Sequence, residues 1–277
     1  MGAFFNRGFT IIETMLVLAI TGVLVAALLV GVGTSVNIQR YRDSVTSLKS
    51  LVQDQYSRVS NVSNDRTTNW SCDSSAQISQ GGATLPAGQS QCLLIGRYIS
   101  IIDTDISMAT VVGYQTSTNS ATSDVAEIFN NYTLGISTSS VETNQLEWGA
   151  QIAWARNGTV DQRLAPATVT PRSIAILIVR SPTSGTTYTF TDDNVAPIAS
   201  VNNAKLKTML IENTATVPGQ KERVVCIVPS GGVVVPEKIA LYIAPSAQDQ
   251  SAIETRTAAI FSTSGGATGT TGNPTQC

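Results

Sequence analysis

Near its N-terminus the chain has a long apolar run without charge, which limits the structures that this region can adopt. Between Glu13 and Arg40 the sequence TMLVLAITGVLVAALLVGVGTSVNIQ contains no charged residue. A transmembrane helix needs about 20 mostly apolar residues, each adding roughly 1.5 Å along the axis. A secretory signal peptide has a shorter apolar core, of about 7–15 residues, with a small-residue cleavage site after it. The run is therefore predicted to be a membrane-spanning helix.

A single carboxylate stands at the start of this apolar region. Glu13 lies within the stretch FTIIETMLVLAI, in which every other residue is apolar or carries a hydroxyl group. A charged group in a membrane segment costs a few kcal/mol and usually has a function. A plain membrane anchor, the alternative interpretation, has no need of such a residue. Glu13 therefore favours a segment that does more than anchor the chain.

The residues around Glu13 form a specific pattern. The sequence RGFTIIETMLVLAITG, which begins at Arg7, resembles the type III signal of type IV prepilins and of the related secretion pseudopilins. The resemblance implies that a prepilin peptidase cuts the chain after Gly8 and N-methylates the new first residue, Phe9. Glu13 would then be the fifth residue of the processed chain.

The same resemblance implies that Phe9 and Glu13 act in assembly. In filaments of this family the N-terminal helices pack into a water-poor bundle. The amine of Phe9 in one subunit would be costly to bury alone, and Glu13 of a neighbouring subunit can supply the opposite charge. We expect this pair to set the axial register of an incoming subunit.

The helix departs from that of many pilins because it has no proline midway along it. The first proline of the chain is Pro86. Gly22, Gly31 and Gly33 are present instead, and each costs about 1 kcal/mol of helix stability relative to alanine. Two interpretations stay open, local melting of the helix and close packing between helices, of which packing is favoured.

Past Arg40 the apolar run becomes an amphipathic pattern. Apolar residues recur at spacings of three and four, as on one stripe of a helix, and they are Ile38, Tyr41, Val45, Leu48, Val52, Tyr56 and Val59. The pattern predicts one continuous helix over residues 9–60, with 9–37 as the transmembrane or filament-core part and 38–60 as an amphipathic stalk. An independent soluble helix is the weaker interpretation, because no break is evident before Asn61.

The remaining residues, 61–277, are predicted to form a β-rich head. Residues 61–88 are polar and rich in turn formers, which predicts a connecting loop. Apolar, β-branched runs predict strands at residues 92–102, 108–114, 173–180, 187–191, 207–212, 223–228 and 238–244.

Turn residues between these runs predict the topology of the head. They indicate one hairpin from 173–180 to 187–191 and a second from 223–228 to 238–244. Helices of useful length are not evident among the strands, so an antiparallel sheet is expected. Residues 121–158 are not assigned. The predicted fold class is α+β, a long N-terminal helix packed on an antiparallel β-sheet head, which the resemblance to pilins also implies.

The four cysteines, Cys72, Cys92, Cys226 and Cys277, include no C-x-x-C pair, which argues against a zinc ribbon or a thioredoxin-like site. The simplest of the three possible pairings is Cys72–Cys92 with Cys226–Cys277, formed in an oxidising compartment. Four free thiols are the alternative. In the resembled family a C-terminal disulfide often holds the last loop on the sheet, and Cys226–Cys277 has a similar placement.

Composition argues against several functions. The chain contains no histidine, which excludes His-dependent triads and His-ligated metal sites. Its net charge of −2, with no basic stripe, predicts no specific contact with nucleic acid. Asp103 and Asp105, and the group Asp192, Asp193 and Asn194, could offer oxygen ligands to calcium. Strand ends and a solvated turn are the preferred interpretations, and no enzyme, metal or cofactor is predicted.

Together these features predict a structural subunit, a pilin that polymerises through its N-terminal helix into a type IV pilus for adhesion, motility or uptake. The expected partners are other copies of the chain, other pilin subunits, the prepilin peptidase, the inner-membrane assembly platform and the membrane. The precursor would span the membrane once before assembly into a cell-surface filament. The alternatives are a secretion-system or competence pseudopilin, and a membrane-anchored surface binding domain that does not polymerise.

Overall fold

The computed structural model describes residues 10–61, 70–80, 92–157, 173–192, 195–212, 223–229, 235, 238–244 and 247–257. The chain divides into two compact units, Met1–Arg42 and Asp43–Cys277. One long helix, α1 (Ile11–Ser60), contributes residues to both units.

The second unit contains two larger antiparallel sheets and a small hairpin. The six-stranded sheet has the order β5-β4-β3-β8-β9, with β6 paired to β4, and the four-stranded sheet has the order β12-β11-β10-β7. The strands of the first are β3 (Cys92–Ile102), β4 (Asp105–Gln115), β5 (Tyr132–Ile136), β6 (Glu142–Gln145), β8 (Ser173–Arg180) and β9 (Thr187–Asp192). The strands of the second are β7 (Ala150–Asn157), β10 (Arg223–Pro229), β11 (Ile239–Ile243) and β12 (Ile253–Thr257). The hairpin joins β1 (Trp70–Cys72) to β2 (Ile78–Gln80).

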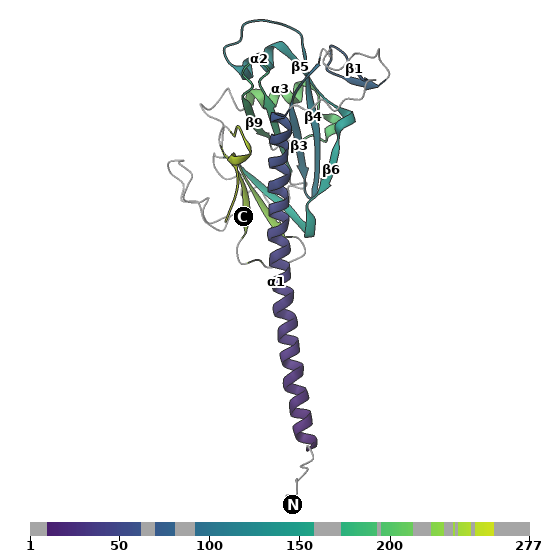
Figure 1. Ribbon diagram of the computed structural model, residues 1–277, viewed down its shortest axis with the longest axis vertical. Helices are drawn as coiled ribbons and strands as arrows, with labels where there is room; N and C mark the ends of the chain where they lie inside the picture. Colours follow the sequence, from purple (N-terminus) through teal and green to yellow (C-terminus); the bar gives the residue numbers. More distant parts are fainter. Residues whose placement is uncertain are drawn as a thin grey trace, which may run out of the picture. The chain divides into compact units, whose positions relative to one another are not determined.

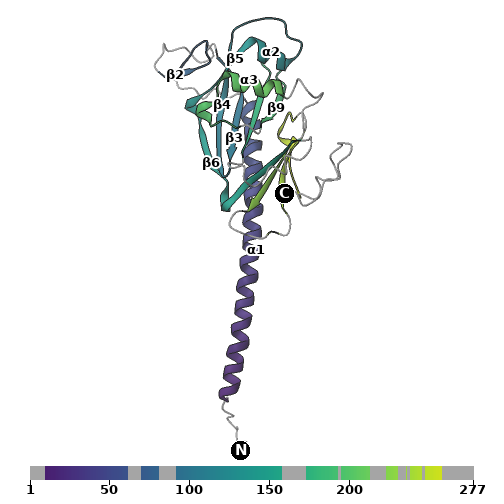
Figure 2. The ribbon, with the colours of Figure 1, turned by 180° about the vertical axis from the view of Figure 1, so that it is seen from behind.

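Successive side chains of a strand point to opposite sides of the sheet. Almost all consecutive residues of β3 and β8 are buried, so both faces of the six-stranded sheet are covered. On one face the cross-strand neighbours Tyr98, Ala109, Leu177 and Phe190 lie in a core that also contains residues of two short helices, α2 (Asp124–Asn131) and α3 (Asn203–Glu212). The opposite face carries Arg97, Thr110, Ile178 and Thr189. Figures 1 and 2 view the sheet from opposite sides, with α1 in front of it in Figure 1 and α3 in front in Figure 2.

The C-terminal part of α1 packs through the predicted apolar stripe. Val45, Leu48, Val52, Tyr56 and Val59 are all buried, as the spacing of three and four predicts. Gln55 and Tyr56 of this segment form hydrogen bonds to Arg97 and Thr189, so it lies on the sheet face opposite to α2 and α3. The predicted α+β fold, a long N-terminal helix followed by antiparallel sheets, is confirmed, and the layout is consistent with a pilin fold.

Most strand predictions are confirmed. Two runs match their strands in full, residues 92–102 in β3 and 173–180 in β8, and the runs at 108–114, 187–191, 223–228 and 238–244 overlap β4, β9, β10 and β11. Both predicted hairpins, β8 with β9 and β10 with β11, pair antiparallel.

The strand prediction for residues 207–212 is wrong, because these residues belong to α3. Leu206, Met209 and Leu210 lie three and four apart and are fully buried in the core beside the sheet. The Asn202 side chain caps this helix by accepting a hydrogen bond of 3.0 Å from the Lys205 N–H. An asparagine at the N-cap position was the signal that should have favoured a helix.

Helix α2 lies in the segment 121–158, to which the sequence pattern assigns no structure. The Ser123 hydroxyl caps it by accepting from the Ala126 N–H at 3.2 Å. The same segment contains β5, β6, β7 and two short 3-10 helices, Thr138–Ser140 and Glu147–Gly149. In addition, the predicted connecting loop at 61–88 contains the strands β1 and β2.

Gly96 of β3 provides a test of this packing. A Cβ added there would lie 2.0 Å from the carbonyl oxygen of Ile178 in β8, and a backbone atom in the middle of a sheet has little freedom to move. At Gly113 of β4 the nearest atom, at 2.6 Å, belongs to the Ile95 side chain. We expect Gly96→Ala to lower the free energy of unfolding by about 3 kcal/mol and Gly113→Ala by about 1 kcal/mol. Denaturant titration of the full chain in detergent measures both, and equal losses would contradict the register of β3 and β8.

Candidate functional site

The N-terminal end of α1 is closed by a reciprocal pair of hydrogen bonds between Thr10 and Glu13. The backbone N–H of Thr10 donates to Glu13 Oε2 at 2.9 Å, and the backbone N–H of Glu13 donates to the Thr10 hydroxyl at 3.2 Å. The Thr10 hydroxyl also donates to Oε2 at 3.1 Å. This arrangement is a capping box, in which the N-cap and N3 residues each satisfy a backbone N–H that the helix leaves unpaired.

The sequence signal for this cap is Thr-x-x-Glu directly before an apolar run, a second pattern that Glu13 belongs to besides the methylation signal. Glu13 is therefore explained in part by local helix chemistry. Any assembly role for its charge has to be separated experimentally from its role as a cap. Gly8 and Phe9, the predicted cleavage and methylation residues, lie outside the described residues.

The part of α1 that follows Glu13 is apolar around its whole circumference. Residues 11–36 are all exposed, including large side chains such as Leu18, Leu24 and Leu29. A helix that is apolar on every side is suited to lipid or to burial among other helices. By length and composition α1 can cross a membrane, since its best 18-residue window has a mean hydropathy of 2.8.

The hydroxyl groups on this segment bond to its own backbone. Thr14, Thr21 and Thr34 donate to carbonyl oxygens three or four residues earlier, at 2.8–3.0 Å. An unsatisfied polar group in a water-free environment costs several kcal/mol, and these bonds remove that cost. The threonines are therefore compatible with lipid and with a dry helix bundle.

The glycines of α1 have no steric role within one subunit. A Cβ added at Gly22, Gly31 or Gly33 would meet no atom within 4 Å. Any requirement for glycine at these positions would have to come from a neighbouring helix. Close packing between subunits at these glycines stays a prediction.

A second polar site joins α1 to the six-stranded sheet, with Arg97 of β3 at its centre. The Arg97 side chain is 7% exposed. It donates from Nε to Gln55 Oε1 at 2.7 Å, from Nη1 to the Thr110 hydroxyl at 2.9 Å, and from Nη2 to Glu142 Oε1 at 3.0 Å. Burial lowers the pKa of the Arg97 guanidinium from its ordinary value, and the hydrogen bond to Glu142 opposes that shift.

Glu142 also links this cluster to the end of α1. Arg58 Nη1 donates to the same oxygen, Glu142 Oε1, at 2.7 Å, and Arg58 Nε donates to Asp54 Oδ2 at 2.7 Å. Two arginines and two carboxylates make the cluster neutral overall. No sequence pattern predicts this cluster, since Arg97 and Glu142 are widely separated from Gln55 and Arg58 in the chain.

On the opposite flank of α1, the buried hydroxyl groups of Tyr56 and Thr189 hold the helix through two consecutive hydrogen bonds. Tyr56 Oη lies 2.7 Å from the Thr189 hydroxyl of β9, which donates to the carbonyl oxygen of Ala247 at 2.7 Å. Burial raises the pKa of Tyr56 from its ordinary value. On the same flank, Gln53 Nε2 donates to the carbonyl oxygens of Gln250 and Ile253 at 2.9 and 3.3 Å.

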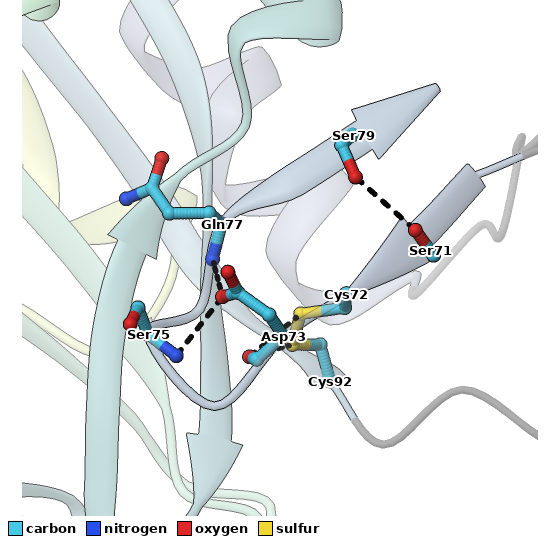
Figure 3. The surroundings of a disulfide bond; sticks show 7 residues. All are labelled: Ser71, Cys72, Asp73, Ser75, Gln77, Ser79 and Cys92. Atoms are coloured by element: carbon cyan, nitrogen blue, oxygen red, sulfur yellow. Dashed lines mark hydrogen bonds between the residues drawn. A yellow bond between two sulfur atoms is a disulfide. The ribbon is translucent and has the colours of Figure 1, made fainter. Parts of the chain in front are cut away.

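A disulfide bond between Cys72 and Cys92 joins the β1–β2 hairpin to the start of β3, as one of the predicted pairings requires. Figure 3 shows the turn beside it, where Asp73 Oδ1 accepts from the backbone N–H groups of Ser75 and Gln77, both at 2.9 Å. The predicted partner of Cys226 in β10, Cys277, lies outside the described residues. The pairing Cys226–Cys277 therefore stays a prediction.

The acidic groups considered for calcium have structural partners. Asp103 lies in the turn between β3 and β4, and Asp105 begins β4 and accepts from Gln145 Nε2 at 2.8 Å. Asp192 ends β9 and accepts from Lys205 Nζ of α3 at 2.5 Å. Asp193 and Asn194 lie outside the described residues. No group of three or more acidic, cysteine or histidine side chains placed to hold a metal occurs in the described part of the chain.

The Cys72–Cys92 bond closes a loop with a sequence separation of 20 residues. Replacing both cysteines by serine should lower the free energy of unfolding by about 3 kcal/mol, since the unfolded chain regains the entropy of that loop. Ser71→Ala serves as the control, because it removes only the Ser71–Ser79 hydrogen bond and should cost less than about 0.5 kcal/mol. Denaturant unfolding measures both variants, and a similar loss in the two would argue against a stabilising disulfide.

Comparison with known protein families matches residues 5–29 to the prokaryotic N-terminal methylation motif. Searches of curated proteins and of solved structures gave no match. The matched residues include Gly8, Phe9, the Thr10–Glu13 cap and the first part of the exposed apolar helix. A motif of this kind followed by such a helix fits a membrane-anchored precursor that later enters a surface pilus. Residues 5–29 therefore carry the methylation motif that the sequence pattern predicts, the signal found in type IV pilins and pseudopilins.

Proposed function

We propose that this protein is a structural subunit of a type IV pilus. The observation that carries the proposal is the methylation motif over residues 5–29, continued by a helix segment that is apolar and exposed on every side. Exposed apolar surface of this extent needs lipid or other helices to cover it. The membrane would cover it in the precursor, and neighbouring subunits would cover it in a filament.

The proposal assigns a separate role to each segment of the chain. Residues 1–8 are a leader that the prepilin peptidase removes, and residues 9–37 form the filament core. Residues 38–60 connect that core to the head, which comprises residues 61–277. The inner-membrane assembly platform and other pilin subunits are the further partners. The role is mechanical and the head supplies the exposed surface, so no catalytic step is assigned.

Glu13 can serve both the helix cap and the assembly contact. Both of its Thr10 contacts use a single oxygen, Oε2, and an ionised carboxylate can accept about four hydrogen bonds. The carboxylate therefore retains capacity for the amine of Phe9 from a neighbouring subunit. That amine exists only after cleavage at Gly8, which makes assembly conditional on processing.

Processing predicts a defined mature N-terminus. Mass spectrometry of the protein purified from its native cell should show a chain that begins at Phe9 with one methyl group on its amine. The Gly8→Arg variant should keep residues 1–8, because the predicted cut follows the glycine of the resembled signal. An intact Met1 in the wild-type protein would refute the processing step.

Two substitutions separate the charge of Glu13 from its cap. Glu13→Gln retains a side chain that can close a capping box but removes the charge, and we expect sheared surface filaments to fall at least tenfold. Thr10→Val removes the cap hydroxyl and retains the charge, at a cost of about 1 kcal/mol of helix stability, and filaments should persist. Immunoblots of sheared and cell-bound fractions measure both.

The alternatives give different outcomes in the same assay. Normal filaments from Glu13→Gln, or loss of filaments only in Thr10→Val, would overturn the charge pairing. A protein that stays cell-bound in the wild type would instead indicate a pseudopilin or a surface domain that does not polymerise.

A further inference from the structure

Residues 43–60 of α1 contact the six-stranded sheet through two chemically different kinds of surface. The first is apolar, with the buried stripe of α1 on one side. The sheet face that carries Arg97 supplies buried isoleucines such as Ile99 and Ile176, which are cross-strand neighbours. Apolar burial has no direction. A stripe with side chains every three or four residues can therefore slide or turn on such a face with little change in buried area.

The second kind of contact is directional and consists of hydrogen bonds, three of which Arg97 makes. The guanidinium is a rigid planar fork, and its three donors reach three different elements: Gln55 on α1, Thr110 on β4 and Glu142 on β6. Thr110 is the cross-strand neighbour of Arg97, so the sheet itself fixes the orientation of the fork. Moving α1 by one turn, about 5.4 Å, would take Gln55 out of reach of Nε.

The opposite flank limits rotation of the helix. Arg97, Ile178 and Thr189 form one cross-strand row over β3, β8 and β9. The consecutive residues Gln55 and Tyr56 bond to the two ends of this row, which are two strand spacings, roughly 10 Å, apart. The helix therefore crosses the row over β8, with one polar contact on each side. Turning it would break at least one of them.

We propose that Arg97, together with the Tyr56–Thr189 contact on the opposite flank, fixes the axial position and rotation of residues 43–60 of α1 on the sheet. This position would determine which head surface a subunit presents to its neighbours in a filament. The second statement rests on the proposed function. The first concerns one subunit alone. Arg97 is thus a positioning residue for assembly, and it acts through the helix on which the head is carried.

A positioning role is physically distinct from a stabilising one. Removing a charge from water is expensive, and buried polar clusters are often replaceable by apolar residues without loss of stability. What such a replacement loses is the single register, as with buried polar residues that specify alignment in helical assemblies. Arg97 should therefore affect geometry much more than melting temperature.

The test compares helix geometry and stability in the same variants. Arg97→Met is combined with Gln55→Leu, because Gln55 would otherwise be left buried without its partner. Spin labels on non-natural amino acids replace Ser50 of α1 and Gln115 of β4, both exposed. The full chain in detergent should show one narrow distance in the wild type. The double variant should show a broader distance distribution, with a melting midpoint within about 5 °C of the wild type.

Two further variants serve as a conservative substitution and as a control. Arg97→Lys keeps the charge and loses the fork, so its distance distribution should be intermediate in width. Arg256→Met removes an arginine whose partners, Glu254 and the Tyr242 ring, lie on β12 and β11, and its distance should match the wild type. An unchanged narrow distance in both Arg97 variants would overturn the proposal. The proposal would also be overturned if Arg256→Met broadened the distance distribution between the labels to the same extent.

The filament readout separates this inference from the proposed function. The Arg97 and Gln55 double variant should reach the membrane in normal amount and yield at least tenfold fewer sheared filaments. Glu13→Gln should also lose filaments but keep the wild-type distance between the labels. If the wild type forms no filaments, the proposed function fails while the distance measurement still decides the role of Arg97. Normal filaments from a double variant with broadened distances would refute the link from register to assembly.

Discussion

The burial of apolar surface by a single helix, α1, is the constraint on which this protein depends. Its two parts meet that constraint differently. Residues 11–36 expose apolar side chains on every side, so their burial has to come from lipid or from other chains. Val45, Leu48, Val52, Tyr56 and Val59 form one stripe that is buried within the subunit. The same secondary structure thus serves an external contact and an internal one, and the distribution of apolar residues around the helix separates the two.

The sheet beneath the second part of α1 is unusual in needing partners on both faces. One face carries Tyr98 and Leu177 and is covered by α2 and α3, and the other receives α1. Strands β3 and β8 are accordingly almost continuous runs of buried residues, without alternation of polar and apolar side chains. Arg97 is an exception to that apolar pattern. Its hydrogen bonds, like that between Tyr56 and Thr189, add directional contacts to an interface that is otherwise largely apolar.

Local signals explain both the successes and the failures of prediction from sequence. Uninterrupted β-branched runs such as residues 173–180 predict strands because few other structures suit them. The run at 207–212 is too short to distinguish a buried strand from a helix by periodicity, and its cap, Asn202, lies outside the run. Glu13 is an isolated charge in an apolar segment, and its position three residues after Thr10 also makes it half of a capping box.

Neighbouring residues in the chain are enough to specify the methylation motif, the extent of the membrane-compatible helix and the stripe that faces the sheet. How α1 is held depends on contacts that form only in the folded head. The Arg97 cluster joins residues from α1, β3, β4 and β6, and no local spacing relates Arg97 to Gln55 or Glu142. Likewise, the sheet has a second apolar face that needs α2 and α3 to cover it. That requirement exists only once the strands have paired.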